Sequence, residues 1–234
     1  MNASPSLAPV GILGMHRSGT SCLAGSLEEA GLFLGDVNTQ APFNKRGNRE
    51  NRAIMDLHDD VLGANGGSWD RAPEGPVVWS DAQKARLDAL IAGFPRDRVW
   101  GFKEPRSLLV LDHWIEVLPR LRFVGTFRHP AAVAASLAHR NQFEPARSYA
   151  LWLAYNRRLI AYQRRSGFPL ISFDWPHERY LGALQSLARS LGLTPPSGGF
   201  RFFTTELRSN SAPVDAALPD EVREVYETLL DIAA

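Results

Sequence analysis

This sequence of 234 residues lacks three things: cysteine beyond a single residue, long apolar runs, and an excess of either charge. The single cysteine, Cys22, cannot form an internal disulfide and suits a reducing compartment, so we expect a cytoplasmic protein. No apolar run approaches the ~20 residues of a membrane helix, and residues 1–10 show no signal-peptide pattern, so neither feature is expected. The 26 Lys and Arg residues against 25 Asp and Glu give a net charge of +1, which argues against a nucleic-acid partner.

The sequence does have the hydrophobic content, 44 percent, and the length for one α/β domain over residues 1–234. We expect a loose lead-in at 1–8 and a mobile, glycine- and serine-rich segment at 198–214. Strand patterns at 9–13, 99–103, 123–127 and 169–173 alternate with amphipathic helical patterns, including 51–62, 107–118 and 147–165. This alternation predicts a three-layer α/β/α fold with a central, mainly parallel sheet.

The segment from Gly14 to Ser21 joins the first expected strand to a helical pattern and has the character of a phosphate-binding loop. The ATP and GTP version of such a loop reads G-x-x-x-x-G-K-[ST]. Gly14 and Gly19 have this spacing, but Thr20 occupies the lysine position and the cation comes earlier, at Arg17. The sequence therefore predicts a P-loop type of nucleotide-binding fold whose anionic ligand is handled differently from Mg-ATP.

Cations follow the ends of three expected strands. Arg17 follows the first, Lys103 with Arg106 ends the second, and Arg128 ends the third. Because ligands of parallel α/β sheets bind outside the carboxyl ends of the strands, these cations should meet in one pocket. We expect that pocket to take a ligand with several negative groups.

With these segments identified, the sequence resembles the sulfotransferases that use 3′-phosphoadenosine 5′-phosphosulfate (PAPS), in particular bacterial and carbohydrate-type members. Residues 16–21, His-Arg-Ser-Gly-Thr-Ser, resemble the family's 5′-phosphosulfate loop. Residues 127–130, Phe-Arg-His-Pro, together with Ser136 resemble its 3′-phosphate element. Residues 102–106 and 44–51 resemble further segments of the bacterial members.

This resemblance, which extends from about residue 11 to residue 162, implies a donor site that needs no metal. Arg17 would neutralise charge on the bridging oxygen, Arg128 and Ser136 would bind the 3′-phosphate, and Arg208 would close over the nucleotide. The full set of donor-binding residues that it implies is His16, Arg17, Ser18, Gly19, Thr20, Ser21, Arg128, Ser136 and Arg208.

The catalytic base is where the sequence departs from the cytosolic small-molecule members. Those members carry a histidine shortly after a lysine-ending strand, whereas Glu104 stands nearby here. Glu50 is our first candidate for the base, because it falls where the acceptor cleft should be, and Glu104 is the second. Lys103 is expected either to contact the transferring sulfuryl group or to pair with Glu104.

The resemblance implies sulfuryl transfer from PAPS to a hydroxyl or amine of a carbohydrate, lipid or small-molecule acceptor. Two alternatives remain open from the residues. An ATP-dependent small-molecule kinase would need a magnesium-binding aspartate, for which Asp174 is the only candidate. A non-catalytic protein that binds adenosine bisphosphate would need the donor residues without the base. The sequence specifies neither the acceptor nor an oligomeric state.

Overall fold

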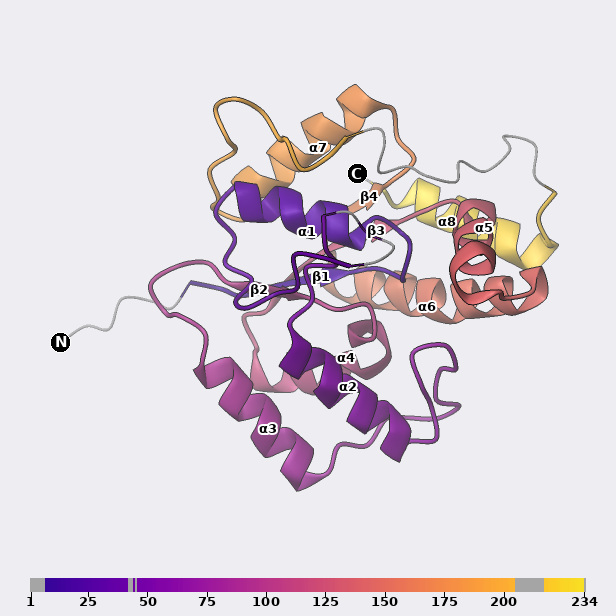
Figure 1. Cartoon of the computed structure of the whole chain (residues 1–234), viewed down its shortest axis with the longest axis horizontal. Coiled ribbons are helices and arrows are strands. Elements are labelled where there is room, and N and C mark those ends of the chain that lie inside the picture. The colour runs from indigo at the N-terminus through magenta and orange to yellow at the C-terminus, as the bar shows by residue number, and fades with distance from the viewer. Residues whose placement is uncertain (1–6, 42–43, 45, 205–216, 234) are drawn as a thin grey trace.

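The structure, a computed structural model, describes residues 7–41, 44, 46–204 and 217–233 (Figure 1). Its centre is a sheet of four parallel strands in the order β2-β1-β3-β4. The strands are β1 (Val10–Leu13), β2 (Gly101–Lys103), β3 (Arg122–Phe127) and β4 (Leu170–Ser172). Because β1 lies between β2 and β3, the three strand ends that carry the predicted cations are neighbours.

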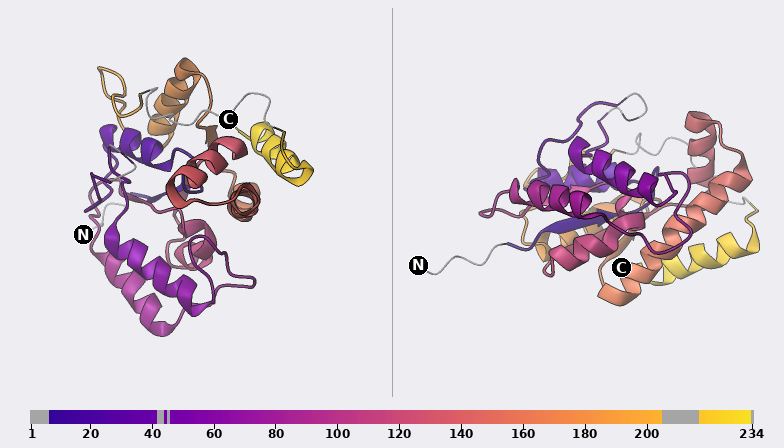
Figure 2. Two further views of the ribbon diagram at one scale, coloured as in Figure 1. Left: turned by 45° about the vertical axis from the view of Figure 1, so that its right-hand side comes forward. Right: turned by 90° about the horizontal axis from the view of Figure 1, so that it is seen from below.

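Helices cover both faces of this sheet (Figures 1 and 2). One face is covered by α1 (Thr20–Glu29) and α7 (His177–Ser190), which contact each other. The opposite face is covered by α2 (Arg52–Ala64), α4 (Ser107–Val117) and α6 (Pro145–Ser166). Onto these pack α3 (Asp81–Ala92), α5 (Pro130–Asn141) and α8 (Asp220–Asp231). No helix in the described ranges has the length and apolarity needed to cross a membrane.

Strands β1, β3 and β4 each contribute to two hydrophobic cores, because successive side chains point to opposite faces. Ile12 packs in the core under α1 and α7, and its neighbour Leu13 packs in the core under α2, α4 and α6. Val124 and Phe123 divide between the same two cores. The strands therefore read as nearly continuous apolar runs, as expected for a parallel sheet buried on both faces.

The predicted α/β/α fold with a parallel central sheet is confirmed, and most differences lie at element ends. The strand expected at 99–103 begins at Gly101, and the helix expected at 147–165 begins at Pro145. The segment expected to be mobile, 198–214, buries Phe200, Phe202 and Phe203 in the core under α1 and α7. These aromatic side chains anchor the start of the segment, and residues 205–214 lie outside the described residues.

Candidate active site

A cavity of about 400 Å³ opens at the carboxyl ends of the strands, where α/β sheets bind ligands. Residues from distant parts of the chain line it. They come from the β1–α1 loop, the end of β2, the last turn of α5, and the segments before and after α2. The predicted convergence of strand-end cations is met in part: Arg17, Lys103 and Arg106 line the cavity, whereas Arg128 is not among its described lining residues.

The β1–α1 loop has a backbone that requires its glycines. Gly14 and Gly19 have φ angles of 152° and 84°. A Cβ atom on Gly14 would lie 2.4 Å from the carbonyl oxygen of Thr126, and one on Gly19 would lie 2.4 Å from the ring of Phe173. Arg17 also has a positive φ, 66°, which is uncommon for a residue with a side chain and is a form of strain found at functional sites.

The loop ends at the N-terminus of α1, which has open hydrogen-bonding capacity. Gly19 is the N-cap and supplies no side chain to the first-turn N–H groups. The hydroxyl of Ser18 is buried and has no hydrogen-bond partner within the described residues. An oxyanion bound here would satisfy both groups.

Arg17 has a neutral partner where a carboxylate would be ordinary. Its Nε–H donates to the hydroxyl oxygen of Ser136, with 2.7 Å between Nε and Oγ. Within the described part of the chain, no carboxylate lies within ion-pair distance of Arg17. Burial, with the charges of Arg140 and Arg128 added, lowers the pKa of Arg17 to about 10. A bound anion would relieve this repulsion, because it would place negative charge among the three guanidinium groups.

Arg128 at the end of β3 is 4% exposed. Its Nε lies 3.4 Å from the Asp174 carboxylate, and its guanidinium lies 5.4 Å from the centre of the Phe173 ring. Asp174 also accepts a 2.6 Å hydrogen bond from the main-chain N–H of His129. The aspartate that the kinase alternative would need for magnesium is therefore engaged with protein groups.

Lys103 and Glu50 form a nearly buried ion pair on the cavity wall. The Lys103 Nζ lies 2.7 Å from the Glu50 Oε1, and the two side chains are 1% and 11% exposed. Lys103 thus pairs with Glu50 and not with Glu104, which was one of its two expected roles. The reason is that neighbouring residues at a strand end point in opposite directions, so Lys103 and Glu104 face different surroundings.

The position of Glu50 is fixed by its neighbours along the chain. Asn51 is the N-cap of α2, and its side-chain oxygen accepts hydrogen bonds from two N–H groups of the first turn. The carbonyl of Glu50 accepts a 3.1 Å hydrogen bond from the N–H of Asn38. Arg49, which precedes it, pairs with Glu28 on α1 at 2.7 Å. Glu50 therefore enters the cavity from a segment that is tied down at both ends.

Glu104 belongs to a buried polar network behind the cavity wall. One carboxylate oxygen lies 2.7 Å from the His58 Nδ1, and the other accepts a 2.5 Å hydrogen bond from the Arg106 Nη1. Burial alone would raise the pKa of Glu104, but the hydrogen bond from His58 and the charge of Arg106 outweigh it and hold that pKa at about 2. The Nε of Arg106 in turn lies 2.7 Å from Asp59.

The protonation state of His58 follows from its second neighbour, Trp114. The indole N–H of Trp114 can only donate, and it lies 2.9 Å from the His58 Nε2. The Nε2 must therefore accept, so the ring proton sits on Nδ1 and is donated to Glu104. Glu104 is fully buried and holds Arg106 on the cavity wall. This geometry gives it a positioning role in place of the expected role as second candidate for the base.

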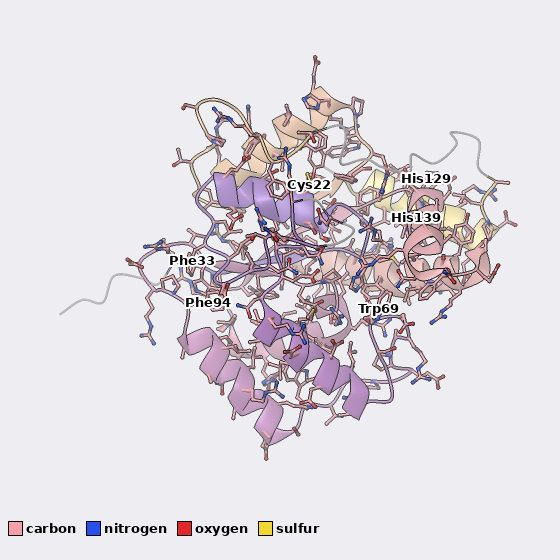
Figure 3. The ribbon with its side chains drawn as sticks, in the orientation of Figure 1. Cys22, Phe33, Trp69, Phe94, His129 and His139 are labelled. Atoms are coloured by element: carbon pink, nitrogen blue, oxygen red, sulfur yellow. The ribbon has the colours of Figure 1, made fainter. Side chains whose placement is uncertain are left out.

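The ring of His16 lies on the cavity wall between two aromatic side chains. Its centroid is 5.0 Å from that of Trp69 and 5.8 Å from that of Tyr155, both in edge-on geometry. Figure 3 shows Trp69 close to the helix pair α5 and α6, where its indole stacks on Phe143. Among the described residues, the His16 Nε2 is buried and has no hydrogen-bond partner. Burial, followed by the charge of Arg106, lowers the pKa of His16 to about 3, so the ring is neutral.

Of the predicted site residues, the structure brings together Arg17, Ser136, Glu50, Lys103 and the loop. Arg208 lies outside the described residues. Sequence reasoning missed His58, although a signal was present: a histidine within the apolar stripe of α2, next to Leu57, calls for a buried polar partner. It also missed Trp69 and Asn141 as cavity residues, for which the sequence pattern held no signal.

The sequence matches no protein-family model and no curated protein sequence. The fold, in contrast, matches solved sulfotransferase structures. The sulfotransferase domain of the olefin synthase from Synechococcus PCC 7002 has a TM-score of 0.59 and 18% identity, over 97% of this chain and 96% of that one. Two others match with lower scores: a sulfotransferase from Alicyclobacillus acidocaldarius (TM-score 0.49, 14% identity, 98% and 93% coverage) and STF1 from Mycobacterium tuberculosis (0.47, 16%, 96% and 76%). The first of these matches shows that the chain has the fold of a sulfotransferase domain.

Proposed function

We propose that this protein transfers the sulfuryl group of PAPS to a hydroxyl or amine of a carbohydrate, lipid or small-molecule acceptor. The observation that carries the proposal is the environment of Arg17. A strained loop holds this guanidinium beside a neutral serine, near two further arginines, on the wall of a cavity at the carboxyl edge of a sulfotransferase-type sheet. Such a site gains its missing negative charge by binding an anion.

The donor would lie across the neighbouring ends of β1 and β3. The phosphosulfate occupies the loop, where it accepts hydrogen bonds from Ser18, from the N-terminus of α1 and from Thr20 and Ser21. The 3′-phosphate binds Arg128, replacing Asp174 as its partner, and Ser136. Arg128 suits this task because a guanidinium can clamp a phosphate through two parallel hydrogen bonds. Arg208 remains a predicted contact.

The transfer step needs the acceptor oxygen in line with the leaving phosphate. The acceptor oxygen attacks sulfur, the bond between sulfur and the bridging oxygen breaks, and adenosine 3′,5′-bisphosphate leaves. Arg17 stabilises the charge that develops on the bridging oxygen. Glu50 takes the proton of the acceptor, and Lys103 orients Glu50 and donates to a sulfuryl oxygen as negative charge builds up.

Calorimetry with adenosine 3′,5′-bisphosphate tests the donor assignment against the kinase alternative. We expect metal-free binding of the bisphosphate that is tighter than binding of ATP with magnesium. Arg128→Ala should weaken it by about 2 kcal/mol or more, because a charge-assisted contact to phosphate is lost. Arg164→Ala, at an exposed position on α6, is the matched control and should bind like wild type. Tighter binding of ATP with magnesium would refute the donor assignment.

Transfer of radiolabelled sulfate from PAPS separates an enzyme from a non-catalytic binder. A panel of glycans, lipids and phenols serves as acceptors, and labelled product is measured with and without protein. Glu50→Gln should retain bisphosphate binding and lose turnover by about 10²–10⁴-fold, the range of a general base. Glu227→Gln, on the exposed side of α8, is the control. Unchanged turnover in Glu50→Gln would remove Glu50 from the mechanism.

A further inference from the structure

Two cations on the described cavity wall away from the loop, Lys103 and Arg106, lie against carboxylates. Lys103 is paired with Glu50, and Arg106 lies between Glu104 and Asp59. The charges of these two cations are therefore compensated within the protein. A negatively charged acceptor gains little from them, because the carboxylates already there would repel it.

Neutral amides take the place of charge on this wall. Asn38, Asn48 and Asn141 all line the cavity. The side-chain oxygen of Asn38 accepts a 2.7 Å hydrogen bond from the main chain of Asn48, and that of Asn48 accepts a 3.3 Å bond from Asn44. Within the described residues, the Nδ2 groups of Asn38 and Asn48 have no acceptor. These amide groups can therefore donate hydrogen bonds to a ligand.

His16 and Trp69 complete what we call the acceptor wall: His16, Asn38, Asn48, Trp69 and Asn141. A neutral imidazole has one donor and one acceptor nitrogen, and a hydroxyl group can match either. The Nε2 of His16 is buried with no partner in the described part of the chain, which costs free energy until a ligand or a turn of the ring supplies one. The indole of Trp69 adds a flat apolar surface next to these polar groups.

Among the described lining residues, aliphatic side chains are few, namely Met55, Pro105 and Leu137. Pockets for apolar small molecules are lined mostly by hydrophobic and aromatic side chains. An apolar acceptor with a single hydroxyl would offer few hydrogen-bond partners to the amides of the acceptor wall, whereas a compound with several hydroxyl groups would offer one to each.

We propose that the acceptor is an uncharged polyhydroxyl compound, such as a sugar or cyclitol, whose hydroxyl groups bind the amides and imidazole of the acceptor wall while its ring lies against Trp69. One hydroxyl is presented to Glu50 and becomes sulfated. The proposal rests on the proposed sulfuryl transfer. It also directs the side chain of His16, for which the resemblance implied a donor contact, towards the acceptor.

Matched acceptors test this class. With PAPS as donor, myo-inositol and methyl α-glucopyranoside are compared with cyclohexanol and 2-naphthol, and glucuronate adds a negative charge to the sugar. We expect kcat/KM for the best neutral polyol to exceed that for either single-hydroxyl compound by on the order of 10²-fold or more, as in sites built to bond a substrate hydroxyl. Glucuronate should be poorer than the neutral glucoside.

Asn141→Leu gives a second readout, with Gln185→Leu on the exposed face of α7 as matched control. The loss of one amide should raise KM for the polyol by about 10-fold and leave the affinity for adenosine 3′,5′-bisphosphate within about 2-fold. Gln185→Leu should change neither. An equal KM in the two variants would contradict the acceptor wall.

The failures of the two proposals are distinguishable. Faster sulfation of 2-naphthol or cyclohexanol than of the polyols, or binding of the bisphosphate with no binding of any neutral polyol by ligand-observed NMR, overturns the acceptor class alone. Absence of bisphosphate binding overturns the sulfotransferase proposal itself.

Discussion

The ends of β1 and β2 both present cations to the same cavity, but they balance positive charge in different ways. At the end of β1, Arg17 meets the neutral hydroxyl of Ser136 in a strained loop. At the end of β2, Lys103 and Arg106 each lie against carboxylates, at 2.5–2.7 Å. In the described part of the chain, the cation at the β1 end has no carboxylate partner, whereas the two cations at the β2 end are matched by carboxylates.

This difference distinguishes a cation that is available to bind a ligand from cations that hold parts of the protein in position. A cation with no carboxylate partner loses little when a ligand arrives and gains the attraction of a new negative charge. A cation already matched by a buried carboxylate is held in place, and removal of its partner leaves an uncompensated charge. The β1 end should therefore dominate donor binding, whereas the buried pair of Glu104 and Arg106 at the β2 end should dominate stability.

The largest effect should come from Glu104→Gln at the β2 end. The change removes the buried one of the two carboxylates that pair with Arg106, and also the charge that faces His58, so we expect a loss of about 3–5 kcal/mol in the free energy of unfolding. Urea unfolding monitored by circular dichroism measures it. Glu116→Gln is the control. Glu116 lies 2.7 Å from the Nδ1 of His113, as Glu104 does from that of His58, but the Glu116 side chain is exposed. Similar midpoints for the two variants would show that the β2 network does not stabilise the fold.

Arg17→Ala should have the opposite effect, a large loss of turnover with little change in the free energy of unfolding. Without the guanidinium, the bridging oxygen loses its main stabilising charge, and turnover should fall by about 10²–10³-fold, or about 2.7–4 kcal/mol. The free energy of unfolding should change little, because the variant also removes repulsion with Arg140 and Arg128. Initial rates with saturating PAPS measure the first quantity and urea unfolding the second. Strong destabilisation would place Arg17 with the positioning residues.

The pH dependence of the free energy of unfolding should show the effect of the lowered pKa of His16. The pKa of His16 is lowered to about 3, below the ordinary 6.5. As the pH falls, the imidazole therefore takes up a proton in the unfolded chain before it does so in the folded protein. The contribution of His16 to the free energy of unfolding is therefore complete above pH 6.5 and declines as the pH is lowered towards 3. Glu104, with a pKa of about 2, adds its own loss only below about pH 4.5.

Between pH 7.5 and 5.0, His16→Asn should therefore lose less stability than wild type, by about 1–2 kcal/mol. His139→Asn is the control, since His139 is exposed on α5 (Figure 3). Unfolding curves at the two pH values measure the difference. Parallel pH profiles of wild type and His16→Asn would argue against a buried neutral imidazole in the cavity.

Ser136→Ala should have the smallest effect. It removes one hydrogen bond to Arg17 and one proposed contact to the 3′-phosphate, so binding of adenosine 3′,5′-bisphosphate should weaken by about 1 kcal/mol. Calorimetry against wild type measures it. A loss as large as that expected for Arg128→Ala would make Ser136 a principal donor contact and would blur the distinction between the two strand ends.

Local patterns explain which parts of this protein could be predicted. The loop from Gly14 to Ser21 was recognisable because glycine spacing, a preceding apolar run and a following helix all lie within a few residues. The buried partners were not recognisable in this way. Lys103 meets Glu50 across 53 residues of sequence, and Arg17 meets Ser136 across 119. Contacts between residues this far apart in the sequence produce no periodic pattern from which they could be predicted.

The sequence by itself determined the alternation of strands and helices, the parallel sheet, and the gathering of cations at one edge, because periodicity and strand direction are local properties of the chain. Only the tertiary structure decided which charges are matched. It left Arg17 with a serine and buried Glu104 between His58 and Arg106, because charge pairing depends on distances of a few ångströms between side chains that the fold, and not the sequence order, brings together.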